Sequence, residues 1–383
     1  MGTGACVISI QDEVARAVQT LQAALDAHPE RRADLMEDCV LRGAPRPYAC
    51  LAIGRGPDTA AGEVMGATPP LPDDPEERLL RRLRAAVMPL DLLNPIAPCI
   101  QLGVGVGTLP ASFGAELAPE MDYSVRRPLD VRSLLDRGMP DPERSGLIPV
   151  MREEIAAALQ RTPDWLRIAP PDMQGPFNIA HALLGDEAFL LPVSEPGAFH
   201  DFMSAITDFW LALHDNLRTW IGPARYPPFP KWTCRITECS ANLVSEQFYV
   251  EHVLPHDRKI AERLGAVGIH PCSGPHVYRV TLRELPNVIY TEAGNVEKTA
   301  AGAISVPEAL REIGDRPIIL VIGQELPPGQ EEAFIRRDLD LARDNPRLTF
   351  GYTGMHWRKS DEELIRELHR RLDDYWQETT ARA

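Results

Sequence analysis

Two pairs of side chains with metal-binding chemistry follow two consecutive apolar stretches in the second half of the chain. Glu238 and Cys239 close one stretch, and His270 and Cys272 close the next. If the stretches are neighbouring parallel strands, these four side chains meet at one edge of the sheet, with the strands about 5 Å apart. Imidazole, thiolate and carboxylate are the ligands that hold zinc in a tetrahedral site. The spacing therefore predicts a zinc centre with His270, Cys272, Glu238 and Cys239 as its ligands.

A competing interpretation of the same residues needs no metal. Cysteine is among the most frequently buried residue types, so core packing of Cys239 and Cys272 is the alternative to ligation. The His-x-Cys pattern at 270–272 supplies only two ligands, and two ligands do not make a site. Both interpretations stay open on the sequence.

Other polar side chains follow apolar stretches at places where a substrate would bind. Glu292, Tyr352 and His356 lie at or after the ends of later stretches, and Gln174 opens a Gln-Gly-Pro-Phe turn. We expect these four side chains to contact the substrate. Aromatic packing in the core is the alternative for Tyr352.

Two further features are expected to be structural. The glycine-rich stretch 103–107 does not match the dinucleotide fingerprint, because Thr108 stands where the third glycine is required. Four histidines in helical or turn-flanked sequence are expected to be packed or solvated: His181, His214, His252 and His369.

A repeating pattern of strands and helices would position these residues. Five apolar stretches are expected to be strands, at 234–238, 266–270, 287–290, 318–322 and 348–352. The helices that follow them are expected at 246–264, 277–285, 307–313, 331–343 and 361–376. Three further strand candidates bring the count to eight, at 48–53, 99–105 and 166–169. Eight serial strand–helix units predict an α/β fold, a TIM (β/α)8 barrel, with an open doubly wound sheet as the alternative.

The first ninety residues have a different pattern. Helical periodicity covers 11–27, and an Arg- and Leu-rich helix is expected at 76–87. A stretch rich in Gly, Pro and Asp at 54–75 separates them and is typical of a long loop. We therefore expect a helical N-terminal extension at 1–95, followed by the barrel at 96–383.

Composition excludes several classes of function. The 383 residues include 40 Lys and Arg against 55 Asp and Glu, a formal net charge of −15, whereas nucleic-acid binding needs a basic surface. No apolar run of about 18 residues and no signal peptide is seen, so a cytoplasmic protein without a membrane partner is expected.

The seven cysteines form no C-x-x-C pair and are expected to be thiols. The sequence carries no signal for an oligomeric state.

Three segments resemble the uroporphyrinogen decarboxylase superfamily. They are Gln174-Gly-Pro-Phe177 before a helix, Ser245-Glu-Gln-Phe248 leading into Val253-Leu-Pro255, and Gly268-Ile-His-Pro-Cys272-Ser-Gly. The likeness spans about residues 98–376. That superfamily consists of TIM barrels and includes tetrapyrrole decarboxylases and cobalamin-dependent methyltransferases. The His-x-Cys pattern at 270–272 is similar to the zinc motif of the methylcobalamin:coenzyme M methyltransferases, so this branch is the closer likeness.

The resemblance implies a reaction and the residues that carry it. In that branch zinc holds the acceptor thiol as a thiolate, which attacks a methyl group on cobalt. His270 and Cys272 would be zinc ligands, and Glu238 matches the glutamate segment, which makes these three the implied catalytic residues. A corrinoid would be the co-substrate on a separate partner protein, because no part of the chain resembles a cobalamin-binding module.

The chain departs from this family at one position. Gly354 stands where the family has a further cysteine ligand, and no cysteine follows Cys272. Either one or both of Glu238 and Cys239 complete the site or zinc is absent, and His356 is a weaker substitute close to Gly354.

The leading hypothesis is a zinc-dependent methyltransferase that moves a methyl group between a corrinoid and a small thiol or methylated substrate. The alternatives are a decarboxylase of uroporphyrinogen or another small acid, and a non-catalytic protein that binds a corrinoid protein. A polycarboxylate substrate fits the net charge of −15 poorly, and the N-terminal region offers only Gly54-Arg-Gly-Pro-Asp58 to bind it.

Overall fold

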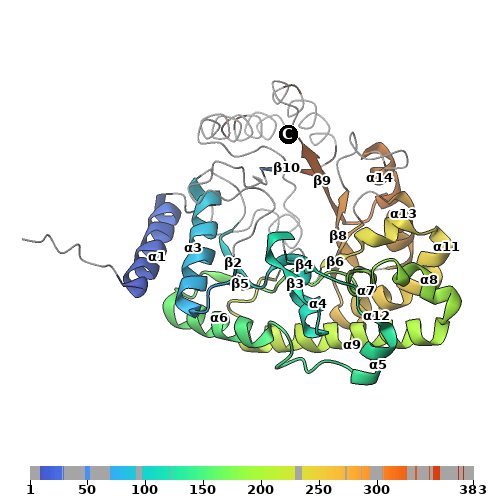
Figure 1. The fold of residues 1–383 in the computed structure, drawn as a ribbon. Coiled ribbons are helices and arrows are strands. Elements are labelled where there is room, and N and C mark those ends of the chain that lie inside the picture. The colour runs from blue at the N-terminus through green and yellow to red at the C-terminus, as the bar shows by residue number, and fades with distance from the viewer. Residues whose placement is uncertain are drawn as a thin grey trace, which may run out of the picture.

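The computed structural model shows helices packed around parallel strands (Figure 1). It describes residues 9–27, 29, 48–51, 70–91, 97–121, 123–228, 235–271, 274–285, 287–293, 304, 306–325, 333, 345, 348–353, 370 and 374. The helices expected at 331–343 and 361–376 fall outside these residues, apart from a few isolated positions, and so do Cys272 and His356.

Eight parallel strands form two sheets. The larger sheet has the order β1-β10-β9-β8-β7-β6. Its strands are β1 (Tyr48–Leu51), β6 (Arg235–Thr237), β7 (Val267–His270), β8 (Val288–Ala293), β9 (Ile319–Glu325) and β10 (Leu348–Thr353). The smaller sheet pairs β2 (Cys99–Gln101) with β5 (Arg167–Ala169). All eight predicted strands are confirmed.

Neither sheet closes on itself in the part of the chain that the structure describes. Chain neighbours are spatial neighbours from β6 to β10, β1 returns to pair with β10, and β2 pairs with β5. Among the described residues no ladder joins β1 to β2 or β5 to β6. Hydrogen bonds still connect the segment after β5 to β6, among them a backbone bond of 2.7 Å from the Gly175 N–H to the Thr237 carbonyl. The structure is therefore an α/β fold with parallel strands, and it does not show a closed barrel.

The described helices include those predicted at 11–27, 76–87, 246–264, 277–285 and 307–313, together with helices between residues 108 and 221, most of which were not predicted from the sequence. They are α1 (Ile10–Ala27), α3 (Pro75–Asp91), α4 (Thr108–Ser112), α5 (Val131–Arg137), α6 (Ile148–Arg161), α7 (Pro176–Leu184), α8 (Glu187–Ser194), α9 (Pro196–Ile221), α11 (Glu246–Phe248), α12 (Leu254–Leu264), α13 (Pro275–Glu284) and α14 (Val306–Ile313). A short antiparallel pair, β3 (Leu117–Ala118) and β4 (Ser124–Val125), lies between α4 and α5. The expected helix 246–264 is interrupted by a π-helical turn, Tyr249–Val253.

The N-terminal helices pack on each other. Val14, Leu21 and Leu25 are buried at helical spacing on α1, and α1 lies beside α3 (Figure 1). An ion pair between Arg84 and Glu13 of 2.8 Å joins the two helices. Because β1 pairs with β10, the N-terminal part also contributes a strand to the main sheet. A domain boundary near residue 95 stays a prediction.

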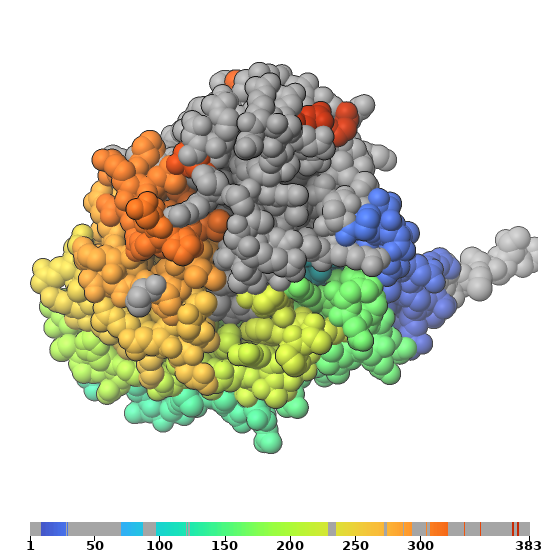
Figure 2. Space-filling view, turned by 180° about the vertical axis from the view of Figure 1, so that it is seen from behind, coloured from blue at the N-terminus to red at the C-terminus, as the bar shows by residue number. Residues whose placement is uncertain are grey.

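The 26-residue helix α9 forms much of the core below the strands. Its buried face carries Phe202, Ile206, Phe209, Leu213 and Leu217, which are spaced three or four residues apart. Seen from behind, the yellow-green, yellow and orange parts of the chain adjoin in one continuous surface (Figure 2). None of the described helices is long and apolar enough to cross a membrane.

Candidate functional site

His270 lies at the carboxyl end of β7 and is bound to Glu292 of β8. The Nδ1 atom of His270 and the Oε2 atom of Glu292 share a hydrogen bond. Glu292 also accepts the hydroxyl of Tyr290 and forms an ion pair with Arg235, with 3.3 Å between Nη1 and Oε2. Two of the predicted site residues, His270 and Glu292, are thus brought together.

The strand register explains this cluster. Arg235 pairs with Gly268, and Gly268 pairs with Tyr290, so the three positions form one row across β6, β7 and β8. Side chains alternate along a strand, so His270 and Glu292 lie on the same face, two residues further on. Gly268 has no side chain, which leaves Arg235 a path across β7 to Glu292.

Arg235 has a second carboxylate partner on the other side. Its Nη2 atom lies 3.1 Å from Oδ2 of Asp172, which follows β5. Burial alone would lower the pKa of Arg235, but the carboxylates of Glu292 and Asp172 outweigh it and raise that pKa. The guanidinium therefore stays charged between two acids.

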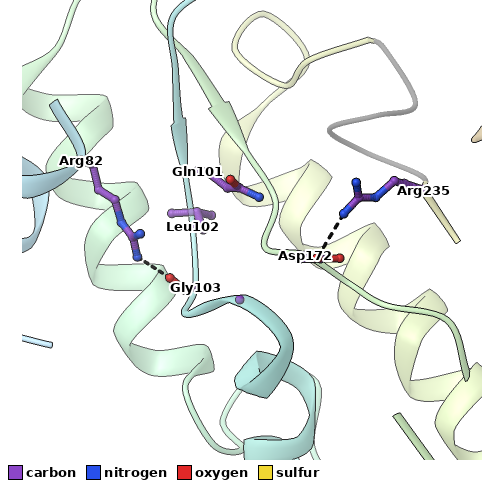
Figure 3. Close-up of a pocket in the computed structure, with 7 residues that line it drawn as sticks. Arg82, Gln101, Leu102, Gly103, Asp172 and Arg235 are labelled. Atoms are coloured by element: carbon purple, nitrogen blue, oxygen red, sulfur yellow. Dashed lines mark hydrogen bonds and ion pairs between the residues drawn. The ribbon is translucent and has the colours of Figure 1, made fainter. Parts of the chain in front are cut away.

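A cavity of about 340 Å³ opens beside this network (Figure 3). Its lining residues come from α3, the end of β2, the loop after β5, and β6: Arg82, Gln101, Leu102, Gly103, Gly105, Asp172 and Arg235. Arg82 reaches in from α3 and donates to the Gly103 carbonyl at 2.5 Å. Gly103 is required there, because its φ is +79° and a Cβ would lie 2.6 Å from Cβ of Pro171. The volume is that of a small-molecule site.

Glu238 points to the opposite face of the sheet edge. It is fully buried, and its two carboxylate oxygens accept the backbone N–H groups of Phe177 and Asn178, each at 3.1 Å. These are the first free N–H groups of α7, whose positive end attracts a carboxylate. The backbone N–H of Glu238 donates to the His270 carbonyl at 3.0 Å. The structure therefore does not bring the Glu238 carboxylate together with the His270 imidazole.

A second buried acid lies against Glu238. Asp257 of α12 is fully buried, accepts the Tyr249 hydroxyl at 2.6 Å, and shares a hydrogen bond with Glu238. The π-helical turn adds one residue between Tyr249 and Asp257, so residues eight apart come onto one helix face. Burial raises the pKa of Asp257 to about 7, and burial together with the Asp257 charge raises that of Glu238. Both carboxyl groups are therefore harder to ionise than an exposed acid.

Gly175 is expected to tolerate no side chain because of Glu238. A Cβ built on Gly175 would lie 2.2 Å from Oε1 of Glu238, although its φ is ordinary for alanine. Replacing Gly175 by alanine should lower the free energy of unfolding by about 1–3 kcal/mol, the usual effect of overpacking. Urea denaturation measures it. Gly197→Ala is the control, because nothing lies within 4 Å of its Cβ; equal effects in both variants would contradict this account.

Gln174 organises the loop between β5 and α7. Its φ is +56°, its side-chain oxygen accepts from Asn178 at 2.8 Å, and its carbonyl accepts from the indole of Trp210 at 3.1 Å. It is buried next to the cavity residue Asp172 but does not line the cavity itself. Its predicted contact with substrate stays a prediction.

The remaining predicted residues are placed only in part. Tyr352 lies in β10 and pairs with Leu51 and Gln324, while its side chain is outside the described residues. Cys272 and His356 also lie outside them. Among the residues that are described, no group of three or more His, Cys, Asp or Glu side chains is arranged to hold a metal.

The cysteines differ from the expectation that all of them are thiols. Cys239 forms a disulfide, so that prediction is wrong for Cys239, whereas Cys99 at the start of β2 is a thiol. A disulfide sulfur has no thiolate to offer a metal. Zinc ligation by Cys239 and this disulfide therefore exclude each other.

Comparison with known proteins finds a similar solved structure but no similar sequence. The chain is similar to a solved structure described as "methyltransferase from Methanosarcina mazei", with a TM-score of 0.62. It shares that fold. The likeness covers 88% of this chain and 97% of the other, at 15% sequence identity. No family model and no curated protein matches the sequence.

Several residues of this site were not predicted from the sequence. They are the cavity residues Arg82, Asp172 and Arg235, and the buried residues Tyr249 and Asp257. A charged residue inside a short apolar stretch is the one available signal, and Arg235 in Cys-Arg-Ile-Thr carries it.

Proposed function

We propose that the protein is a zinc-dependent methyltransferase of the uroporphyrinogen decarboxylase superfamily, which moves a methyl group between a corrinoid and a small thiol or methylated substrate. The observation that carries the proposal is His270 at a strand end with its Nδ1 atom bound to Glu292. A carboxylate on one imidazole nitrogen is the usual support for a zinc-binding histidine. The fold shared with the Methanosarcina mazei methyltransferase supports the same class of reaction.

The proposed zinc ligands are His270, through Nε2, and Cys272, with Cys239 joining them once its disulfide is reduced. Glu238 is left out of this set, because its carboxylate already binds two N–H groups and Asp257. When bound, zinc stabilises a substrate thiol as its thiolate at neutral pH.

The other site residues support this chemistry without forming bonds to the methyl group. Glu292 accepts the Nδ1 proton of His270 and so fixes the tautomer that leaves Nε2 for the metal. The cavity between Arg82 and Arg235 takes the small substrate. We further propose that the eight strands belong to one closed barrel, and that a corrinoid protein docks at its mouth.

Turnover of methylcobalamin tests this function. The zinc-loaded protein is mixed with methylcobalamin and a panel of small thiols, and cob(I)alamin formation is followed by absorbance. We expect thiol-dependent demethylation. No turnover with any thiol, together with tight binding of a corrinoid protein, would favour a non-catalytic binder. Release of CO2 from a small acid without any corrinoid would favour the decarboxylase.

Zinc binding is expected to require reduction of the Cys239 disulfide. Reduced protein should bind about one zinc per chain, because thiolates are preferred zinc ligands, and oxidised protein should bind it far more weakly. Metal content after desalting, with and without a phosphine reductant, measures this. Cys239→Ser should weaken binding, and Cys99→Ser is the matched control because the Cys99 thiol is not one of the proposed ligands. Equal zinc content in oxidised and reduced protein would contradict a role for Cys239.

A further inference from the structure

Arg235 links the cavity to His270 through two ion pairs. One arm of its guanidinium, Nη1, lies 3.3 Å from Glu292, and the other arm, Nη2, lies 3.1 Å from Asp172. Glu292 in turn holds Nδ1 of His270. The side chains of Arg235 and Glu292 are 23% and 13% exposed, so solvent screens this chain of contacts only in part.

The geometry points to Arg235 as a positioning residue. We infer that it fixes the Glu292 carboxylate against His270 and ties both to the cavity wall at Asp172. This inference rests on the proposed function, because its consequence is the orientation of a metal-binding imidazole. Arg235 itself bonds to neither metal nor methyl group.

The chemistry of the side chain supports this role. A guanidinium is a rigid planar fork that binds two carboxylates in fixed directions, whereas an ammonium is a point charge. Arg235 reaches two strands across because Gly268 stands between it and β8. Without Arg235, Glu292 would be a largely buried carboxylate that has lost the positive charge beside its hydrogen bonds to Tyr290 and His270.

Two substitutions at Arg235 and one matched control test the inference. Arg235→Gln removes the charge, Arg235→Lys keeps it without the fork, and Arg82→Gln changes the other cavity arginine, which binds the Gly103 carbonyl instead of Glu292. Cobalt(II) affinity and the visible spectrum of the cobalt-substituted protein are measured for each. In parallel, ¹⁵N imidazole shifts are recorded for His270 in the metal-free protein.

Arg235→Gln should weaken cobalt(II) affinity about 10- to 100-fold, the usual effect of losing outer-shell support for a ligand. It should also shift the His270 ¹⁵N signals toward mixed tautomers. Arg235→Lys should restore part of both, and Arg82→Gln should leave both unchanged. Unchanged affinity and ¹⁵N signals in a folded Arg235→Gln protein would overturn the inference, as would equal losses in Arg82→Gln.

The two readouts separate this inference from the proposed function. If wild-type protein binds no cobalt or zinc, the proposed function fails while the ¹⁵N signals still report on Arg235. Should Arg235→Gln fail to fold by thermal melting, Asp172→Asn takes its place, because it removes the anchor at the cavity wall and leaves the Glu292 ion pair. Asp172→Asn should shift the His270 ¹⁵N signals toward mixed tautomers. No shift at all would count against the link to the cavity.

Discussion

Replacing His270 by alanine is expected to remove bound zinc and to reduce methyl transfer by more than about 100-fold. The His270 imidazole is a proposed ligand that is hydrogen-bonded to Glu292, and Arg235 forms an ion pair with Glu292 in turn. Outer-shell changes alone cost about 10- to 100-fold in metal affinity, so loss of the ligand itself should cost more. Metal content by mass spectrometry and the rate of cob(I)alamin formation measure the two effects.

The control for His270→Ala is His276→Ala. His276 lies six residues further on α13, where its Nε2 atom contacts the Ala241 carbonyl at 3.1 Å, away from Glu292. This variant should keep its zinc and most of its activity. Zinc retained at wild-type level in His270→Ala would refute the assignment of His270 as a ligand.

Replacing Glu238 by alanine is expected to destabilise the protein by about 3–5 kcal/mol. The change leaves two N–H groups at the start of α7 and the buried Asp257 without the partner that they have now. Chemical denaturation measures the effect. Glu262→Ala, at an exposed position on α12, should change the free energy of unfolding by no more than about 0.5 kcal/mol. Similar losses in the two variants would rule out the role assigned to Glu238.

The same buried pair predicts how stability depends on pH. The pKa of Asp257 is about 7 in the folded protein and about 3.9 in an unfolded chain. Between these values the folded state holds more protons than the unfolded state, so the free energy of unfolding falls as pH rises from about 4 to 7 and levels off above. The slope from this group is at most about 1.4 kcal/mol per pH unit.

Asp257→Asn should flatten this part of the profile, because the asparagine side chain does not titrate. It keeps an oxygen that can accept the Tyr249 hydroxyl, so the fold should survive. Unfolding curves at pH 5, 6, 7 and 8 give the comparison. An unchanged slope in Asp257→Asn would place the origin of the pH dependence elsewhere.

The fold was accessible from the sequence because its signals are local. Apolar stretches bounded by turns located all eight strands, and helical periodicity located α1, α3 and α12. What local signals do not carry is closure, which depends on pairing between residues far apart in the chain. In the described parts of the chain, no ladder joins β1 to β2 or β5 to β6. The π-helical turn at Tyr249–Val253 was not predicted either, because 246–264 was expected to be one continuous α-helix.

The candidate site was predicted only in its broad location. His270 and Glu292 were expected at strand ends and are found together, but the ion pairs of Arg235 bridge strands and leave no pattern in the sequence. Glu238 shows why the location of a strand end does not settle which way a side chain points. Successive side chains lie on opposite faces of a sheet, so a shift of one residue in the expected strand end reverses the face on which Glu238 lies. Here this alternation places Glu238 under α7, where its bonds are structural.

The zinc K-edge absorption spectrum of reduced, zinc-loaded protein tests the central claim most directly. The proposed site predicts one nitrogen neighbour at about 2.0–2.1 Å and sulfur at about 2.3 Å. His270→Ala prepared in the same way should hold little zinc, and any zinc that it retains should lack the imidazole nitrogen contribution. A shell of oxygen neighbours without sulfur, or an imidazole signal that persists in His270→Ala, would contradict a zinc centre at His270.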